Sequence, residues 1–499
     1  MLSLEQNFPF VCIILSMATG ILCAALKPKK AMVVCISNLV INFILSLLAL
    51  KYCITAGEST VFWMGHFPAP FGNEIRFGVL ETLLATGFSL VMLLSILGGL
   101  KHVFHDVDES KQNYYFLMQN LLFASILALI YTNDLFTAYV FVEINTLTSC
   151  SIVMLKKGRE TLVATTRYLI MSLLGSGLFL IGISILYDIT GHLLMPQIKE
   201  SVEALALSGS YTFPLEMIIC LFSIGMGVKS ALYPFHSWLP DAHGSATSSA
   251  SAVLSGLVLK GYIILLIKMF YRVFGLEIIY NSRVLDILFA LGILAMTIGS
   301  IKAISERDLK RMIAYSSVAQ IGYIYLGIGI GNELGMAAAL LQVLVHAFTK
   351  PMLFNTAGAF MDVCDGKKKF KYLAGAARKN MFAGIIFAIG ALSMIGIPLF
   401  AGFSVKYYLG LSALENPSRV VLSIIALIIS TVLNAIYYIP ALMVLFRKTK
   451  ETENVVFIPK NPDIPYIVSS VVFAVANFVF GIFAAYFIDL IIKGLGMFA

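Results

Sequence analysis

The stretch VKSALYPFHSWLPDAH, residues 228–243, places a lysine, two histidines, an aspartate and two prolines directly after a long apolar run. Proline removes a helical hydrogen bond and does not continue a regular helix. Inside a membrane, the backbone groups freed by such an interruption are tolerated only against protein or a water-filled cavity. The stretch therefore predicts an interrupted transmembrane helix that lines a polar cavity, with Pro234 at the break.

The composition marks the whole chain as an integral membrane protein. Of its 499 residues, 59% are hydrophobic and only 12% are charged, a balance far outside the range of soluble domains. A transmembrane helix needs ~20 mostly apolar residues, and such runs follow one another almost from end to end. The sequence predicts an all-α integral membrane protein with about fourteen spans, at 7–26, 31–50, 78–100, 114–131, 134–155, 166–187, 214–239, 250–271, 284–304, 313–331, 336–361, 382–411, 420–446 and 467–492.

The spans also suggest an internal repeat. Two blocks, roughly 114–272 and 284–446, each contain five spans, and an odd number of spans inverts the second block relative to the first. The sequence NDL at 133–135 weakly echoes RDL at 307–309. Inverted repeats of this kind are typical of transporters, which bind their ions on interrupted helices near the midplane.

A second interruption is predicted late in the second block. Span 12 carries Gly396, Pro398 and Gly402, which weaken or break a helix. We therefore expect broken helices 7 and 12. The expected division of the chain is helices 1–3 in 1–112, a first five-helix repeat in 113–272, a second inverted repeat in 284–446, and helix 14 in 447–499.

Lysine and arginine predict the orientation, because cytoplasmic loops are enriched in them. Most of the 35 fall in loops after odd-numbered spans, including KKKFK at 367–371. The alternate loops hold only Lys51, Arg76, Lys199, Arg272, Arg283 and Arg419. We expect a multi-pass protein of the cell membrane with both termini extracytoplasmic, and we attribute the net charge of +8 to topology rather than to nucleic-acid binding.

The cysteines and histidines give no sign of a bound cofactor. The seven cysteines form no CxxC pair, which argues against iron–sulfur ligation and against a disulfide framework. His102, His105, Asp106 and Asp108 have metal-like spacing, but they fall in a predicted cytoplasmic loop, where solvated side chains are expected. We expect neither a cofactor nor a metal in this chain.

Ionisable side chains deep in the spans carry the functional prediction. A lysine or carboxylate at the bilayer centre costs ~2.5–3.5 kcal/mol on insertion scales, so each one needs a reason. Glu143, Lys229 and Lys260 lie deep in spans 5, 7 and 8. A Glu and a Lys ~6 Å apart at an effective dielectric of ~20 attract by ~3 kcal/mol, which opposes the desolvation that favours a neutral lysine. Such a lysine gains or loses a proton as its partner's charge changes; a buried ion pair that only fixes helix packing is the alternative.

A second group of ionisable side chains lies in spans 11 and 12. His346 and Lys350 are four residues apart and share one helical face, which suits a proton relay because histidine titrates near neutrality; a structural histidine is the alternative. Lys406 follows the break in span 12. Lys268 and Lys493 lie near span ends, where a long side chain can reach the interface. The deep charges together predict a lateral polar line through spans 5, 7, 8, 11 and 12.

Five motifs resemble, in order, the signatures of one family. They are VKSALYPFHSWLPDAH at 228–243, SGLVLK at 255–260, ERDLKRMIAYSSVAQIGY at 306–323, HAFTKPMLF at 346–354 and GIPLFAGFSVK at 396–406. The family is the antiporter-like, proton-pumping membrane subunits shared by respiratory complex I, the Mrp cation/proton antiporters and the membrane-bound hydrogenases. The resemblance covers about 114–410 and implies fourteen helices, two inverted five-helix repeats and broken helices 7 and 12.

The resemblance also implies roles for the buried charges. Glu143 resembles the helix-5 glutamate and Lys229 its helix-7 lysine partner. The remaining matches are Lys260 to the central helix-8 lysine, His346 and Lys350 to the helix-11 pair, and Lys406 to the terminal helix-12 position. Lysine at this last position is similar to certain complex I subunits and to the D-type Mrp subunit. The sequence departs from the family at 244–247, where a proline is common, and at Glu81, where an aspartate is usual.

We therefore expect a non-redox membrane subunit of an ion-translocating oxidoreductase, NADH dehydrogenase-like or hydrogenase-like, that moves protons, with sodium left open. Protons would enter near His236, Asp241 and His243, the last two in the cytoplasmic connection to span 8. They would pass along Lys229, Lys260, His346 and Lys350 and leave near Lys406. Redox cofactors would lie in partner subunits, which would include homologous antiporter-like subunits. One alternative is the D-type subunit of a Mrp Na+/H+ antiporter without a redox partner. Another is a scaffold that no longer conducts, against which the cost of the buried charges argues.

Overall fold

A computed structural model describes residues 4–64, 67, 72–209, 211–449, 454–459 and 462–498. The first half of the chain contains the helices α1 (Phe8–Ala25), α2 (Pro28–Ala56), α3 (Val79–Gly98), α4 (Leu100–Asp106), α5 (Gln112–Tyr131), α6 (Leu135–Met154), α7 (Arg159–Thr190), α8 (Met195–Ser208), α9 (Thr212–Lys229), α10 (Trp238–Ser245), α11 (Ser248–Val253) and α12 (Leu259–Met269). A short antiparallel hairpin, β1 (Thr60–Trp63) and β2 (Glu74–Phe77), precedes α3.

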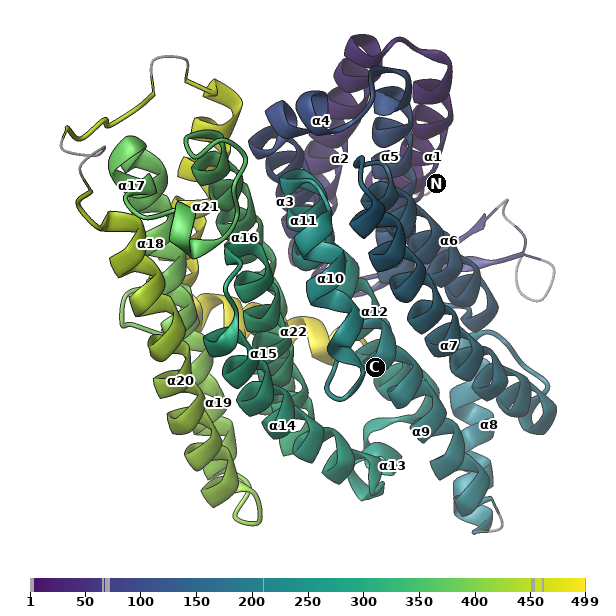
Figure 1. Cartoon of the computed structure of the whole chain (residues 1–499). Helices are drawn as coiled ribbons and strands as arrows, with labels where there is room; N and C mark the ends of the chain where they lie inside the picture. The colour runs from purple at the N-terminus through teal and green to yellow at the C-terminus, as the bar shows by residue number, and fades with distance from the viewer. Residues whose placement is uncertain are drawn as a thin grey trace.

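The second half contains the helices α13 (Leu276–Asn281), α14 (Val284–Ser305), α15 (Leu309–Ile330), α16 (Glu333–Asp362), α17 (Ala376–Lys379), α18 (Met381–Ile395), α19 (Ala401–Leu414), α20 (Val420–Phe446), α21 (Ile464–Ile482) and α22 (Ala484–Phe498). The long helices run roughly side by side across the bundle (Figure 1). The end of the molecule with α4 and α17 is called the upper end below, and the end with α8 and α13 the lower end.

Thirteen helices in the described part of the chain are long and apolar enough to cross a membrane. The remaining predicted span, 382–411, is present as α18 and α19, and neither half alone has the length of a span. The predicted all-α membrane fold with about fourteen spans is therefore confirmed.

The first helix break lies where the proline-containing stretch predicts it. The helix α9 ends at Lys229, Ala231 adopts a positive φ of 58°, and regular helix resumes only at α10. Pro234 lies inside this interruption. The helix α10 is held against α7 by Trp238, whose ring stacks on Tyr168 with centroids 4.2 Å apart.

Asp241 and His243, expected in the connection to span 8, lie between α9 and α11 in a short helix rather than in a loop. Both belong to α10, and His243 is fully buried. Pro240 does not end this helix because it occupies the first turn, where a missing N–H leaves no bond unmade.

The second helix break separates α18 from α19. Gly396 ends α18 with a left-handed φ of 90°, and Leu399 follows with φ of 84°. At Gly402, a Cβ atom would lie 1.8 Å from the carbonyl oxygen of Ser393, so the re-entering chain passes α18 at a distance that only glycine permits. The predicted break in helix 12 is confirmed.

The weak echo between the two five-span blocks has a structural counterpart. Asp134 caps α6 by accepting from Thr137 N at 2.7 Å, and Asp308 caps α15 by accepting from Lys310 N at 2.9 Å. Each aspartate also forms an isolated β-bridge with the segment that follows the next long helix, Asp134 with Leu194 and Asp308 with Lys369. The same cap and bridge thus recur at corresponding places of the two blocks.

The last predicted span, 467–492, is not one helix. The helix α21 ends at Ile482, and α22 begins after Phe483 and packs on α3 and α16. In Figure 1, α22 lies across the bundle rather than along it. Phe483 itself is apolar, but Gly481 stands two residues before it and is a local signal that the span prediction did not use.

The helices that carry the central charges form the core of the bundle. The segment 248–274 and the helix α16 are wholly buried over their most apolar windows, and α15 is nearly so. In contrast, only about a third of the residues in the corresponding windows of α2 and α20 are buried, and Ile44 and Ile428 are among the exposed ones. Such apolar surfaces match lipid or partner helices, whereas the charges lie in the interior.

Candidate functional site

Lys260 lies on helix 8, which consists of α11, the π turn η5 (Leu254–Val258) and α12. The side chain is fully buried. A π turn replaces the usual i→i−4 bonds by i→i−5 bonds, and Lys260 Nζ donates to the carbonyl oxygen of Ser255, five residues earlier. Ser255 Oγ also lies 2.9 Å from Ser317 Oγ of α15. The central lysine is therefore held by a neutral acceptor of its own helix.

The π turn packs tightly on α16. A Cβ atom at Gly256 would lie 2.6 Å from the ring of Pro351, which is the residue after Lys350. Pro351 lacks a backbone N–H, so it leaves a carbonyl of α16 without its helical partner. The π turn of helix 8 and the proline of α16 are therefore in contact, each within a few residues of Lys260 or Lys350.

Lys229 is the last residue of α9 and is fully buried. Its Nζ donates to Thr146 Oγ1 at 2.6 Å and lies 5.1 Å from the centroid of the Tyr262 ring. Tyr262 in turn donates to Asn145 Oδ1 at 2.9 Å. The lysine therefore joins the end of the broken helix 7 to α6 and to helix 8.

Glu143, the predicted partner of Lys229, lies on α6 one turn before Thr146. It is half-buried, and its Oε1 has no hydrogen-bond partner within the described ranges. The two residues interact electrostatically, but Lys229 bonds to Thr146 instead of to the carboxylate. The structure thus places the predicted pair close together and not in contact.

Lys350 and His346 are both fully buried on α16. Lys350 Nζ donates to Ile313 O at 3.0 Å and to Ser316 Oγ, both on α15. His346 interacts electrostatically with Lys260, Lys350 and His243. Neither of its ring nitrogens is bonded to another described residue. His346 therefore lies among buried ionisable side chains without being fixed by a hydrogen bond to a described residue.

Lys406 lies beside the break in helix 12. Its Nζ donates to Ile395 O at 2.5 Å and to Thr431 Oγ1 at 2.9 Å, and it lies 5.3 Å from the centroid of the Tyr323 ring. Ile395 is the last residue of α18, so its carbonyl belongs to the unpaired, partly negative end of a helix. The break supplies the acceptor that holds this lysine.

The three residues predicted to take up protons have different surroundings. His236 is half-buried, and its Nδ1 has no partner among the residues described. Asp241 is held at the upper end by Arg167 at 2.8 Å and Arg311 at 2.6 Å. His243 stacks on Phe354 of α16 with centroids 4.6 Å apart. Only His243 of the three belongs to the central group around His346.

The prediction that Lys268 reaches the membrane interface is wrong. The side chain is fully buried, and its Nζ donates to the carbonyl oxygens of Leu129, Ile130 and Thr132 at the end of α5. These carbonyls are unpaired because α5 ends there, and a cation at a helix C-terminus is favoured. Lys493, the other lysine expected at the interface, is exposed on α22.

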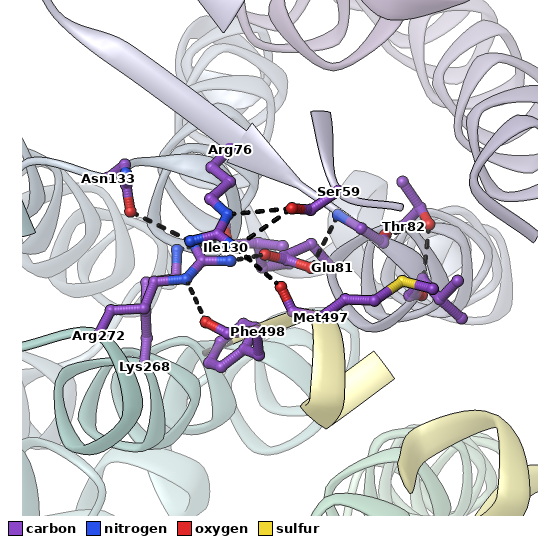
Figure 2. Close-up of polar contacts among 12 residues, drawn as sticks. Ser59, Arg76, Glu81, Thr82, Ile130, Asn133, Lys268, Arg272, Met497 and Phe498 are labelled. Carbon is purple, nitrogen blue, oxygen red and sulfur yellow. Dashed lines mark hydrogen bonds and ion pairs between the residues drawn. The ribbon is translucent and has the colours of Figure 1, made fainter. Parts of the chain in front are cut away.

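Arg272 is likewise buried rather than in a loop, in a second π turn, η6 (Phe270–Phe274), that extends helix 8. Figure 2 shows its guanidinium between Glu81, Asn133 and Phe498. It pairs with Glu81, and both side chains are only 1% exposed. Sequence spacing missed this pair, although a glutamate at the start of α3 in an apolar span was a usable signal.

The same arginine fixes the end of α22. Arg272 Nε donates to Phe498 O at 2.8 Å, and Arg76 Nη2 donates to Met497 O at 3.1 Å (Figure 2). Glu81 Oε2 accepts from Gly78 N at 2.9 Å. The cluster therefore joins β2, α3, helix 8 and α22 at one buried point.

The HxxHDxD segment is divided between two environments. His105 is 85% exposed, as expected for a solvated loop, but the His102 side chain is only 9% exposed, so the expectation is wrong for His102. Within the ranges that the structure describes, no three His, Cys, Asp or Glu side chains gather as metal ligands.

Comparison with known proteins gives consistent matches. Residues 132–434 match the family described as "NADH:quinone oxidoreductase/Mrp antiporter, TM". The chain is 34% identical to the N-type subunit of the NADH-quinone oxidoreductase of Desulforudis audaxviator over 397 residues, which cover 78% of this chain and 76% of that protein. It is 28% identical to the D-type subunit of the Na(+)/H(+) antiporter of Alkalihalophilus pseudofirmus over 368 residues, covering 73% and 72%.

Two solved structures share the fold over almost their whole length. One is the Mrp complex of Dietzia sp. DQ12-45-1b, with a TM-score of 0.86 at 20% identity, covering 99% of this chain and 97% of that chain. The other is an archaeal membrane-bound sulfane sulfur reductase, a respiratory membrane complex, with a TM-score of 0.86 at 23% identity, covering 98% and 97%.

Proposed function

Because the chain belongs to the NADH:quinone oxidoreductase/Mrp antiporter family of membrane proteins, we propose that it translocates protons as one membrane subunit of a multisubunit complex. The observation that carries the proposal is a row of lysines whose amino groups bond to neutral acceptors, namely the fully buried Lys229, Lys260 and Lys350 and the partly buried Lys406. A buried amino group that no carboxylate fixes in its charged form can take up and release a proton as nearby charges change. Arg272 differs from these lysines, because the carboxylate of Glu81 holds its charge in place.

The row supplies a path along the membrane. A proton taken up near His236, Asp241 or His243 passes to Lys260, crosses to His346 and Lys350, and leaves near Lys406. The closeness of Lys260, Lys350 and His243 to His346 supports the middle of this path. The unbonded ring nitrogens of His346 support its role as the carrier between the lysines, because both are free to exchange a proton.

Glu143 and Lys229 form the coupling element of the proposal. When Lys229 bonds to Thr146, as here, its positive charge stays near helix 8; when it moves to Glu143, that charge is neutralised. The change in field alters the proton affinity of Lys260. Because Glu143 is half-buried on a helix whose Leu147 is 56% exposed, a neighbouring subunit can influence this switch.

The upper end faces the cytoplasm in this proposal, because it carries the lysine-rich loops such as 367–371. Both termini then face away from the cytoplasm. The redox cofactors of an NADH dehydrogenase-like or hydrogenase-like complex lie in partner subunits. The likeness to the D-type subunit of an Na(+)/H(+) antiporter supports a second candidate, sodium/proton exchange without a redox partner.

The decisive experiment replaces the central lysine in the assembled complex. The complex is purified through a tag on this chain, its subunits are identified by mass spectrometry, and proton movement is followed with a pH-sensitive dye in proteoliposomes. The complex is driven by the electron donor of its copurifying partners or, where no redox partner is present, by a sodium pulse. We expect Lys260→Ala to abolish proton movement while the subunits still copurify.

The matched control is Lys51→Ala, because Lys51 is an exposed lysine on α2 outside the row. It should move protons like the unmodified complex. Normal proton movement in Lys260→Ala would refute the proposal. The copurifying proteins decide between the two candidates, since redox subunits support the pump and their absence with sodium-driven exchange supports the antiporter.

A further inference from the structure

A cavity of about 320 Å3 is lined by residues of α4, α16 and α21, among others. Figure 1 shows where these helices lie at the upper end. Five titratable side chains line the cavity, namely Lys101, His102, Asp362, Asp463 and Tyr466. None of them belongs to the row of lysines described above. The cavity nevertheless lies at the end of α16, the helix that carries His346 and Lys350.

Asp362 connects the surface to the interior of this cavity. Its Oδ2 accepts from Nζ of Lys101 at 2.7 Å, and the Lys101 side chain is 55% exposed. Its Oδ1 lies 3.1 Å from Nε2 of His102, within reach of an ion pair but without the alignment of a hydrogen bond. A proton that arrives at the exposed side of the carboxylate therefore has a buried imidazole as its next acceptor.

His102 is the feature of the cavity that points to a ligand. Its side chain is nine-tenths buried, and Nδ1 has no hydrogen-bond partner among the described residues. The ring packs closely against the backbone of α16 at Gly358, where a Cβ atom would lie 2.7 Å from it. Buried polar atoms are ordinarily satisfied by protein or water, and imidazole exchanges protons near neutral pH. The ligand that suits this nitrogen is water or hydronium.

Asp463 adds a second acid to the cavity. It caps α21 by accepting from Tyr466 N at 3.3 Å. Burial raises the pKa of Asp463 above its ordinary value, although the bond from Tyr466 N and the charge of His102 act in the opposite direction. Asp463 therefore holds a proton at less acidic pH than a solvated aspartate does.

Below the cavity, polar side chains follow the contact between α16 and α21. Tyr466 donates to Thr356 Oγ1 at 3.3 Å, and Thr349 donates to Asn477 Oδ1 at 3.2 Å. The two threonines are seven residues apart, about two helical turns, and so lie on one face of α16. Thr349 directly precedes Lys350. The polar contact thus reaches from the cavity to the level of the lysine row.

Between these two contacts lie buried polar atoms that no described residue satisfies. They are Oδ1 of Asn355, Oγ of Ser470 and Oγ of Ser95. Gly98 leaves room for polar groups here, because a Cβ atom would lie 2.4 Å from Asn355 Nδ2 and 2.5 Å from Ser469 Oγ. Unsatisfied buried polar atoms in such a series are the usual setting of bridging water.

We propose that this cavity is a second entrance for protons and that it supplies Lys350 through the α16–α21 contact. The inference rests on the proposed function. Water in the cavity gives a proton to Asp362 or His102. Each hydroxyl below, with its bridging water, accepts one proton and releases another, so that the neutral amine of Lys350 becomes an ammonium and no charge stays in between. The two entrances then serve different lysines of the row.

The test uses the assembled complex in proteoliposomes and compares matched pairs of variants. The target is the double variant His102→Ala with Asp362→Asn, and the control is His105→Ala with Asp365→Asn, because His105 is 85% exposed and Asp365 is 90% exposed on the same side. We expect the target to lower the rate of proton movement by about tenfold, as for loss of a positioned proton carrier. The control should keep the full rate.

Chemical rescue separates proton transfer from a structural effect. The cavity is large enough to admit free imidazole, so added imidazole should restore much of the rate to His102→Ala and should not affect the control. Tyr466→Phe, which removes one hydroxyl at constant shape, should also slow proton movement. A target that behaves like the control, or a loss that imidazole does not restore, would overturn the inference. If Lys260→Ala blocks proton movement while the target is normal, the inference fails and the proposed function stands.

Discussion

At the scale of single residues, the lysines of the row and Arg272 differ in their partners. The lysines of the row bond to hydroxyls and carbonyls, whereas Arg272 bonds to the carboxylate of Glu81. A fully paired buried charge has little freedom to change its protonation, and its stabilising effect depends on both partners being present. The pairing with Glu81 therefore marks Arg272 as a structural charge.

Glu81→Gln should therefore destabilise the protein without blocking the proton path. Removing one partner of a buried ion pair costs about 3–5 kcal/mol, because the remaining charge is uncompensated. We expect a lower midpoint of thermal unfolding in detergent and a normal proton-to-electron or proton-to-sodium ratio in the complex that survives. The double variant Glu81→Gln with Arg272→Met should recover much of the lost stability. A double variant as unstable as the single one would contradict this interpretation.

Some of these buried charges could be predicted from the sequence and others could not. Lys260 and Lys350 could be predicted because they lie far from both ends of long apolar runs, where no lysine reaches water. Lys268 and Arg272 could not, because the sequence does not show that helix 8 continues through a π turn to Phe274. Near a span end, a buried lysine that caps another helix and a lysine that reaches the interface have the same spacing in sequence.

At the scale of elements, the capped helices α6 and α15 show that the weak similarity between NDL at 133–135 and RDL at 307–309 corresponds to a repeated local structure. Asp134 and Asp308 each stand one residue before a long helix and bond to its first backbone N–H groups. Each also pairs with a strand-like segment after the following helix. The aspartates thus fix where corresponding helices of the two repeats begin.

Replacing these caps should loosen the helix starts. Asp134→Ala and Asp308→Ala should each cost about 0.5–2 kcal/mol, the usual effect of losing an N-cap. Hydrogen exchange should rise in the first turn of α6 or α15 respectively and stay unchanged elsewhere. Asp188→Ala, at an exposed position in α7, provides the control. Equal exchange in the variants and the unmodified protein would contradict a capping role.

The breaks and bends at the element scale were predictable to different degrees. Proline and glycine announce the interruptions in helices 7 and 12, because both residues weaken helical hydrogen bonding in a recognisable way. The bend between α21 and α22 follows Gly481 but has no proline, so its local signal is weaker. The direction of α22 is fixed by its packing on α3 and α16 and by the contacts of Arg76 and Arg272 with its last carbonyls, which are tertiary interactions.

At the scale of the whole molecule, a surface cluster ties the connections of the upper end together. Asp106 of α4 lies 2.9 Å from His105 Nδ1 and 3.0 Å from Nζ of Lys156, which follows α6. Val107 forms a β-bridge with Lys156 beside it. The cluster thus links the N-terminal three helices to the first repeat. Burial alone would raise the pKa of Asp106, but the hydrogen bond from His105 and the charge of Lys156 outweigh it and lower the pKa.

This cluster predicts a specific dependence of stability on pH. Because the pKa of Asp106 is lower in the folded protein than in the unfolded chain, its contribution is complete above the ordinary value of about 4. It is lost as the pH falls through the lowered value. The difference in unfolding midpoint between the unmodified protein and Asp106→Asn should therefore be constant near neutrality and shrink in acid. Asp365→Asn, at a 90% exposed site, should show little difference, and a constant gap down to acid pH would exclude the cluster as its source.

The two π turns that bracket α12 give helix 8 a property of its own. Each π turn contains one residue more than a turn of α-helix. The side chains after it are therefore rotated about the helix axis by about 100° relative to an unbroken α-helix. Lys260 follows the first π turn and Lys268 precedes the second. Within α12, the amino group of Lys260 therefore bonds to the backbone of its own helix, and that of Lys268 bonds to α5. A row of side chains predicted from a spacing of 3.6 residues is therefore displaced twice along helix 8. The directions in which Lys260 and Lys268 point therefore depend on the number of residues in each π turn. Deletion of one residue from a π turn would change these directions, whereas most substitutions there would not.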